Sequence, residues 1–485
     1  MKGFTSLKNI QKDLQNSTVT CVELVEHYLD RIKDQKDINA FVETFDVSAN
    51  AQAVLVDAKI KEGKAGVLAG LIISIKDNIC YEGHKLSASS KMLEGFESLY
   101  SSTVVKRLLK EDAIIIGRTN CDEFAMGSSN ETSFYGPVKN PLDKNKVAGG
   151  SSGGAAASVA AGLCMAALGS DTGGSIRQPA SFTGTVGLKP TYGRVSRHGL
   201  IAFGSSFDQI GTFTKNVEDA ALITEVMAGK DEFDSTVSRK EVEPYFAEID
   251  SQKDKKQRIA YFDCYVNHEA IDSEVKKRTI EIIEKLRLEG HQVDEVKFDY
   301  LDQIVPTYYV LTTAEASSNL ARYDGIHFGY RSTNATDLES TYVKSRSEGF
   351  GREVKRRIML GTYVLSAGYY DAYYTKAQKV RRLVRDCTNE VFENYDFIIS
   401  PTSPHTAFDL NAQKDDQIKM YLEDIYTVQA NLAGIPAISL PLGIGSDKMP
   451  FGIQLMTSAF NEKKLLSFSK QLVNKFELTS ESEKA

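Results

Sequence analysis

The chain has 485 residues and a net charge of −7 at pH 7, from 58 Lys and Arg against 65 Asp and Glu. This balance argues against broad nucleic-acid binding by the chain alone, because such binding draws most of its affinity from neutralising phosphates. With 42% hydrophobic residues and no apolar run of membrane-spanning length, the composition is that of a large globular α/β protein, not a membrane protein.

Residues 1–60 predict an N-terminal helical segment packed on the core. Thr20 and Glu23 form a capping-box pattern, and apolar residues then recur at helical spacing from Val22 to Ile32. The first residues, MKGFTSLKNIQKDLQ, lack the continuous apolar stretch of a signal peptide. We therefore expect a cytoplasmic protein.

A large domain over 61–475 follows. Its first part, about 65–220, alternates short apolar runs such as 71–75 with helical patterns, and 155–162 before 163–168 is one such pair. Alternation of this kind predicts a mixed central β-sheet with helices on both faces.

The charged stretch at 251–258 indicates a boundary in this domain, followed by a strand over 258–262 and a helix over 273–288. A helix-rich insertion is expected over about 265–390, and C-terminal strands and a helix over 395–475. These late strands can return to the first sheet. The last residues, 476–485, predict a disordered tail.

The six cysteines are widely scattered, with no CxxC pair and no histidine at metal-ligand spacing. They are typical of reduced thiols. No metal site is expected in this chain.

Two glycine-serine loops, GGSSGG at 149–154 and SDTGGS at 170–175, are the most informative feature. Ten of the 35 glycines lie within residues 147–189, so the backbone must turn sharply or approach something closely there. Ser151 and Ser175 are 24 residues apart, enough for a helix of about ten residues and a strand of about six. Such a path brings both serines to one edge of the sheet.

A serine nucleophile needs a base, because its hydroxyl is inert at neutral pH. None of the seven histidines lies in either loop, although His198 and His405 have loop-like surroundings. Lys76 directly follows the apolar run 71–75 and offers another base. Burial in an apolar site can lower a lysine pKa from about 10.4 toward 7–8, where it acts as a base.

Two other interpretations use the same loops. Residues 149–153 fit G-x-S-x-G, the nucleophile elbow of α/β-hydrolases, but the preceding PLDKNKVA is polar instead of a buried strand. Neither loop has the Gly-Lys-Ser/Thr ending of a phosphate-binding P-loop.

At these residues the chain resembles the amidase signature family: a lysine at a strand end, then GGSSGG, then GSDTGGSIR. The resemblance implies an amidase signature fold and a Ser-cisSer-Lys triad. It implies that Ser175 is the nucleophile, that Ser151 relays the proton after a cis peptide bond, and that Lys76 is the base. It also implies an oxyanion hole of backbone N–H groups at Thr172, Gly173, Gly174 and Ser175. Ala148, in place of proline, and Ala155, in place of serine, depart from the pattern.

Longer segments, including AEASSNLARYDG and EVKRRIMLGTY, resemble one subfamily, the A subunits of glutamyl-tRNA(Gln)/aspartyl-tRNA(Asn) amidotransferases. This resemblance implies that the chain hydrolyses glutamine and releases ammonia. It implies substrate binding by Tyr308, Arg357 and Asp424, with Ser128 as a weaker candidate. An arginine can fork onto an α-carboxylate, and an aspartate can accept from an α-ammonium group. The adjacent Tyr309 and Arg356 leave a one-residue ambiguity.

The same resemblance implies a heterotrimer. A B subunit would bind the misacylated tRNA and use ATP and Mg²⁺, and a small C subunit would wrap the contact, so that no cofactor belongs to this chain. The choice between Glu-tRNA(Gln) and Asp-tRNA(Asn) stays open. A stand-alone amidase for another small amide and a non-catalytic scaffold are the alternatives. The substrate-binding set argues against the first and the intact triad against the second.

Overall fold

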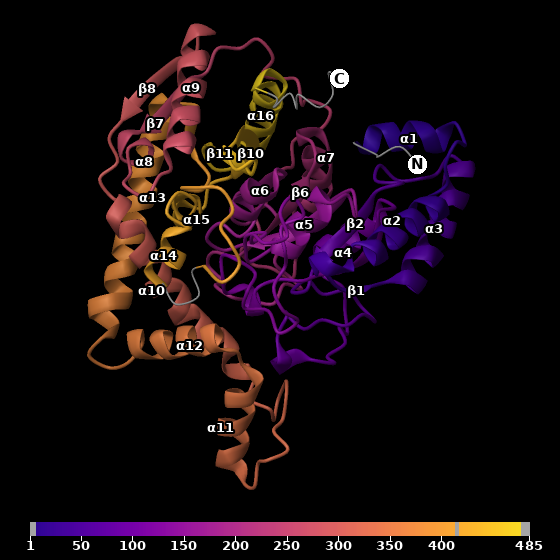
Figure 1. Cartoon of the computed structure of the whole chain (residues 1–485), viewed down its shortest axis with the longest axis vertical. Helices are drawn as coiled ribbons and strands as arrows, with labels where there is room; N and C mark the ends of the chain where they lie inside the picture. The colour runs from indigo at the N-terminus through magenta and orange to yellow at the C-terminus, as the bar shows by residue number, and fades with distance from the viewer. Residues whose placement is uncertain (1–5, 413–416, 477–485) are drawn as a thin grey trace.

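The computed structural model of the chain describes residues 6–412 and 417–476. In this part of the chain, eleven strands form one sheet in the order β1-β3-β2-β4-β6-β5-β10-β11-β9-β7-β8 (Figure 1). The strands are β1 Phe41–Thr44, β2 Ile72–Lys76, β3 Ile114–Thr119, β4 Ala166–Asp171, β5 Val186–Lys189, β6 Gln209–Thr214, β7 Arg258–Phe262, β8 Gln292–Val296, β9 Phe397–Pro401, β10 Ala437–Ile444 and β11 Pro450–Met456.

Strand β2 runs parallel to β3 and β4, and β7 runs parallel to β8 and β9, while the other neighbouring pairs are antiparallel. The predicted mixed sheet is therefore confirmed. The α-helices of the described residues are α1 Leu7–Gln15, α2 Cys21–Asp34, α3 Asp46–Lys61, α4 Thr103–Lys110, α5 Gly153–Ala160, α6 Arg177–Thr183, α7 Val217–Met227, α8 Asp263–Val266, α9 Ser273–Leu288, α10 Leu301–Asn319, α11 Leu338–Gly349, α12 Arg352–Val364, α13 Lys376–Asn394, α14 Gln417–Leu422, α15 Val428–Ala433 and α16 Glu462–Phe476.

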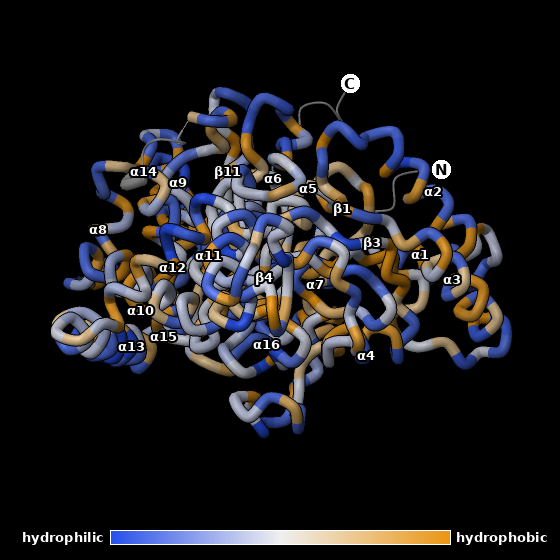
Figure 2. The backbone as a smooth tube through the Cα atoms, turned by 90° about the horizontal axis from the view of Figure 1, so that it is seen from below, coloured by the Kyte–Doolittle hydropathy of each residue, from blue (hydrophilic) through white to orange (hydrophobic). Residues whose placement is uncertain are grey.

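Helices cover both faces of the sheet, as successive residues of its strands show. In β9, Ile399 belongs to a buried cluster with residues of α7, α9 and α16, whereas Ile398 belongs to a cluster with residues of α10, α13 and α15. In β10, Ile438 and Ala437 divide in the same way. Because side chains alternate across a strand, the two clusters lie on opposite faces. Figure 2 shows further hydrophobic stretches around β3, α3 and α4.

The N-terminal segment forms helices as predicted, and the capping box of Thr20 and Glu23 is present at α2. Sequence analysis missed strand β1, Phe41–Thr44, which pairs antiparallel with β3 at one edge of the sheet. Four half-buried residues between two helices are too short for a periodic signal. The predicted tail 476–485 lies outside the described residues except for Phe476, which ends α16.

The charged stretch at 251–258 does not end the sheet. Strand β7 follows it directly and pairs with β9, so the later strands extend the sheet that the first half began. Strand β10 pairs with β5. The expectation that the late strands return to the first sheet is therefore confirmed.

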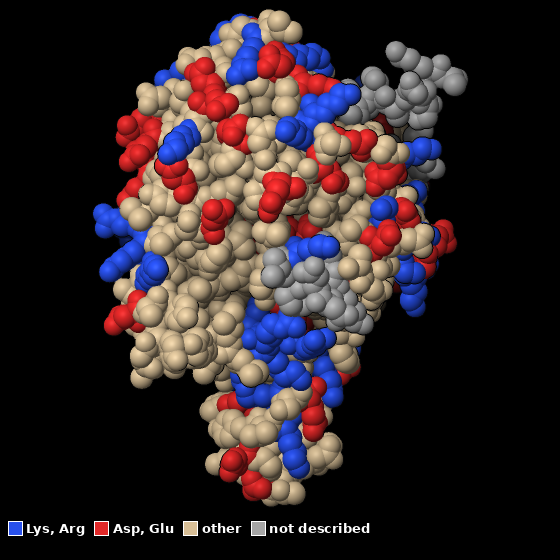
Figure 3. All heavy atoms as spheres, turned by 60° about the vertical axis from the view of Figure 1, so that its left-hand side comes forward, with Lys and Arg blue, Asp and Glu red and all other residues tan. Residues whose placement is uncertain are grey.

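The helix-rich part forms a column beside the sheet, from which α11 protrudes (Figure 1). On the face in Figure 3, Lys and Arg side chains gather just above this protruding arm, whereas elsewhere both signs of charge are interspersed. Among the helices of the described residues, none has the length and apolar character needed to cross a membrane.

Candidate active site

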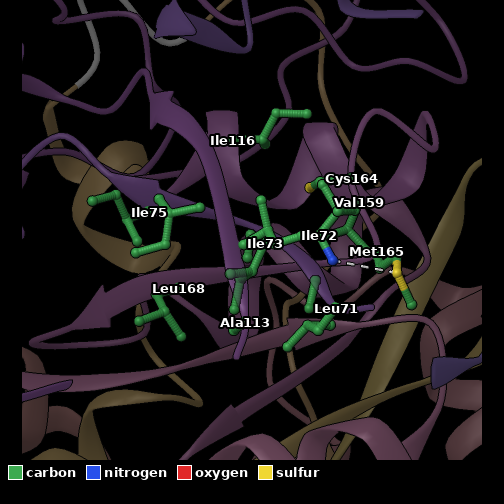
Figure 4. Close-up of a cluster of buried hydrophobic side chains, with 14 of the residues drawn as sticks. Leu71, Ile72, Ile73, Ile75, Ala113, Ile116, Val159, Cys164, Met165 and Leu168 are labelled. Carbon is green, nitrogen blue, oxygen red and sulfur yellow. Dashed lines mark hydrogen bonds between the residues drawn. The ribbon is translucent and has the colours of Figure 1, made fainter. Parts of the chain in front are cut away.

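Lys76 is the last residue of β2, a strand whose five residues are all buried. Figure 4 shows the apolar side chains behind it: Ile73 and Ile75 of β2 pack with Val159 of α5 and Leu168 of β4. This bed leaves no water around the amine, and Lys76 itself is 0% exposed. Burial lowers the pKa of Lys76 to about 8, although nearby acidic groups oppose the shift.

Three serine hydroxyls surround the Lys76 amine. Its Nζ lies 2.7 Å from Ser151 Oγ, 2.9 Å from Ser152 Oγ and 3.0 Å from Ser170 Oγ. A neutral lysine keeps one lone pair, so it can accept a proton from one hydroxyl while donating to the other two. The structure thus brings Lys76 and Ser151 together in the arrangement that proton transfer requires.

The first loop, GGSSGG, precedes α5 and is packed too closely for side chains. The peptide bond between Gly150 and Ser151 is cis, as the family resemblance implies. A Cβ on Gly150 would lie 2.2 Å from Asp122 Oδ2. On the other side, the Gly150 N–H donates to Gln178 Oε1 at 3.0 Å, and Gln178 Nε2 donates to the Ser128 carbonyl at 2.9 Å. Gln178 therefore joins the loop to the segment that carries Ser128.

The second loop connects β4 to α6 and carries Ser175. Among the described residues, no acceptor contacts the backbone N–H of Gly173, Gly174 or Ser175. Three unused donors beside a serine are what an oxyanion hole needs. The Thr172 hydroxyl donates to Asp208 Oδ1 at 2.6 Å, which holds the start of the loop.

A buried ion pair fixes the ends of the second loop. Arg177 Nη2 lies 3.0 Å from Asp171 Oδ1, and both side chains are fully buried. Asp171 also accepts from the Ile176 N–H, and Arg177 holds its pKa below the usual value despite burial. Exposure increases outward from the base, because Lys76 and Ser151 are 0% exposed and Ser175 is 8% exposed. A substrate arriving from solvent reaches Ser175 first.

The predicted substrate-binding residues gather above this loop. Tyr308 of α10 packs on Gly173, where a Cβ would lie 2.5 Å from Tyr308 Cζ. Its neighbour Tyr309 donates to Asp424 Oδ2 at 3.1 Å, and Ser128 Oγ lies 3.4 Å from the same oxygen. Both tyrosines thus contact the site, and they do so through different partners.

Arg357 and Asp424 supply the charges of this region. The Arg357 guanidinium lies 5.3 Å from the Tyr309 ring centre, and its Nε donates to Glu353 Oε1 at 2.8 Å. Arg357 is 2% exposed, and Arg356 turns to the other oxygen of Glu353 and is half-buried. Burial raises the pKa of Asp424 to about 7, opposed by Tyr309 and Arg357. A bound cation would restore the charged form.

Several residues of the site were missed by sequence analysis. Ser152 and Ser170 contact Lys76, Asp122 packs on Gly150, and Gln178 joins the loops. Ser152 and Ser170 adjoin the two motifs, so their position was a signal. Asp122 and Gln178 carried none.

The histidine alternatives do not reach the base. His405 pairs with Glu423 at 2.8 Å, and His198 stacks on Tyr100 and Phe233. The GGSSGG loop follows irregular chain and not a buried strand, so it is not a nucleophile elbow. Among the described residues, no group of three or more His, Cys, Asp or Glu side chains is placed to hold a metal ion.

This sheet, with a lysine at a strand end and two glycine-serine loops around it, is the arrangement of an amide-hydrolysing enzyme. The family model described as Amidase matches residues 23–466. The chain belongs to this family, the amidase signature family that its motifs resemble.

Within the family, the chain is most informatively compared with three relatives. It is 50% identical to the glutamyl-tRNA(Gln) amidotransferase A subunit of Chlorobium phaeobacteroides, over 96% of this chain and 98% of the relative. It is 51% identical to the protein of the same name from Chlorobium luteolum, over 97% of each chain. The crystal structure of the Thermotoga maritima protein of that name matches with a TM-score of 0.79 and 38% identity, covering 99% of this chain and 98% of that one.

Proposed function

We propose that this chain is the glutamine-hydrolysing A subunit of a tRNA-dependent amidotransferase. The observation that carries the proposal is the buried Lys76 amine on the Ser151 hydroxyl, within a chain about half identical over nearly its whole length to glutamyl-tRNA(Gln) amidotransferase A subunits. A stand-alone amidase is not favoured, because these relatives carry the name of an amidotransferase component.

In the proposed mechanism, Ser175 Oγ attacks the side-chain amide carbon of glutamine. The Ser175 proton passes to Ser151, whose own proton passes to neutral Lys76. Lys76 then returns a proton through Ser151 to the departing nitrogen, the C–N bond breaks and ammonia leaves. Water attacks the resulting ester by the same route, freeing glutamate and Ser175. The unused N–H donors of the second loop support stabilisation of the oxyanion in both steps.

In the proposed substrate complex, the amino-acid end of glutamine lies between Arg357 and Asp424. Arg357 would bind the α-carboxylate and Asp424 the α-ammonium group. Tyr308, packed on Gly173, would line the path of the side chain to Ser175. The contacts of Asp424 with Tyr309 and Ser128 leave room for a charged partner, since two neutral hydroxyls do not neutralise a carboxylate.

The ammonia is the useful product in this proposal. We expect a B subunit to bind the misacylated tRNA, to activate its carboxyl group with ATP and Mg²⁺ and to receive the ammonia, and a C subunit to join the two. This chain would hold no cofactor and would work in the cytoplasm. Its net charge of −7 agrees with binding of the RNA elsewhere in the complex.

The complex provides the test of the function. We expect the full-length chain to copurify with the B and C subunits of its organism and to support glutamine-dependent amidation of Glu-tRNA(Gln). Assays with Glu-tRNA(Gln) and Asp-tRNA(Asn) side by side determine the acceptor. Hydrolysis of glutamine without amidation of either tRNA would contradict the role in an amidotransferase complex and leave an amidase.

Replacing Arg357 by lysine is expected to raise the KM for glutamine about 10- to 100-fold, because lysine keeps the charge and loses the bidentate fork, whose charge-assisted hydrogen bonds are worth about 1.5–3 kcal/mol. The matched control is Arg356→Lys, which should leave KM within about threefold, since Arg356 lies on the outer side of Glu353. Initial rates of glutamate formation measure both. A larger effect at Arg356 would move the carboxylate site by one residue.

A further inference from the structure

A short turn links the substrate-binding carboxylate to the nucleophile loop. Asp424 begins this turn and Thr427 ends it, directly before α15. The N–H groups of Thr427 and Val428 both donate to the Asp424 carbonyl, at 3.0 and 3.1 Å, so the turn is closed on itself. Figure 1 shows it between the column of α10 and α13 and the core helix α6.

The Thr427 side chain contacts the nucleophile loop at its centre. Thr427 Oγ1 lies 2.6 Å from the Gly173 carbonyl oxygen and 3.1 Å from the Asp424 carbonyl oxygen. A hydroxyl has one hydrogen, and the shorter contact identifies Gly173 as its main acceptor. The residue is fully buried, so no water competes for this hydrogen bond.

The loop is shaped to fit this threonine. A Cβ on Gly174 would lie 2.3 Å from Thr427 Oγ1, and Gly174 has a φ of +149°. Both the missing side chain and the backbone conformation are thus needed for the close approach. Arg177, beyond the other end of the loop, donates to the Thr427 carbonyl at 2.8 Å. Thr427 is therefore held from behind and holds the loop in front.

The contact fixes the direction of one oxyanion donor. The Gly173 carbonyl and the Gly174 N–H belong to the same planar peptide unit and point in opposite directions. A hydrogen bond that draws the carbonyl toward Thr427 directs the Gly174 N–H away from it, where it meets no acceptor among the described residues. Loss of the hydroxyl frees this peptide to rotate, since glycines on both sides offer little resistance.

We propose that Thr427 is a positioning residue that couples glutamine binding at Asp424 to the oxyanion hole, by holding the Gly173–Gly174 peptide with its N–H toward the reacting carbonyl. The inference rests on the proposed glutaminase function. Substrate bound by the Asp424 side chain orders the turn, and the same turn orders the loop through Thr427. Its contribution is to the transition state, because the oxyanion forms only there.

Thr427→Val tests this, because valine keeps the shape and removes the donor, and Thr427→Ser is the matched control that keeps the hydroxyl. In the full-length chain with its partner subunits, we expect Thr427→Val to lower kcat for glutamine hydrolysis about 10- to 100-fold and to leave KM within about threefold. Thr427→Ser should keep kcat within about threefold of the wild type. Thr427→Ala serves as a second variant if valine impairs folding, which thermal unfolding reports.

A glutamine analogue with a γ-aldehyde adds a second readout, because its adduct with Ser175 carries the oxyanion. Its affinity should fall in Thr427→Val by the same factor as kcat/KM, while the affinity for the product glutamate stays unchanged. Wild-type kcat in Thr427→Val, equal losses in the valine and serine variants, or an effect confined to KM would each overturn the inference. A wild-type chain that neither hydrolyses glutamine nor binds the aldehyde would instead overturn the proposed function, and this inference with it.

Discussion

Replacing Ser175 by alanine is expected to lower glutamine hydrolysis by at least about 10⁴-fold, since removal of a nucleophile leaves only substrate binding and the oxyanion hole. The change removes one oxygen from a side chain that is 8% exposed, so the melting temperature should shift little. A γ-electrophilic glutamine analogue should label the wild-type chain and leave the variant unlabelled, as intact mass measures.

Free ammonia provides the control for this variant. In the assembled complex, amidation of tRNA driven by added ammonium salt should continue at the wild-type rate, because it bypasses the hydrolysis of glutamine. A Ser175→Ala chain that still hydrolyses glutamine or still takes the label would remove Ser175 from the role of nucleophile.

Replacing Lys76 by methionine is expected to lower kcat about 10³- to 10⁴-fold, the range typical of a lost general base. The wild type should show kcat rising with pH and levelling above an apparent pKa of about 8, because protonated Lys76 cannot accept the serine proton. Below that pKa the neutral fraction, and hence the rate, falls tenfold per pH unit. The residual activity of Lys76→Met should lack this limb.

The matched control for the loss of a lysine is Lys215→Met. Lys215 donates to the Ala160 carbonyl at 3.3 Å, at the end of α5 opposite to the serine loop. We expect its activity and pH profile to match the wild type. A pH-independent wild-type rate between pH 6 and 9, or a Lys76→Met variant with wild-type kcat, would contradict Lys76 as the base.

The pattern of apolar runs was sufficient to predict the mixed sheet, and most boundaries of its strands and helices follow from that pattern alone. Strand β7 and helix α9 begin and end where predicted. The short edge strand β1 and the return of β10 to β5 needed the tertiary structure. Four residues give no periodic signal, and no local pattern specifies a partner more than 200 residues away.

Local sequence also determined which residues are candidates for the chemistry. Glycines around Ser151 and Ser175, and an apolar strand leading to Lys76, are visible without coordinates, because each depends on neighbours in the chain. The family's motifs added Tyr308, Arg357 and Asp424 by resemblance.

Only the tertiary structure decided how these residues meet. The pKa of Lys76 falls because side chains from β2, α5 and β4 exclude water together, which no single segment does. Tyr309 contacts Asp424 across 115 residues, and Thr427 contacts Gly173 across 254. Hydrogen bonds between such distant residues depend on packing geometry within a few tenths of an ångström. The sequence therefore determined the reactive groups, and the fold determined their protonation, direction and support.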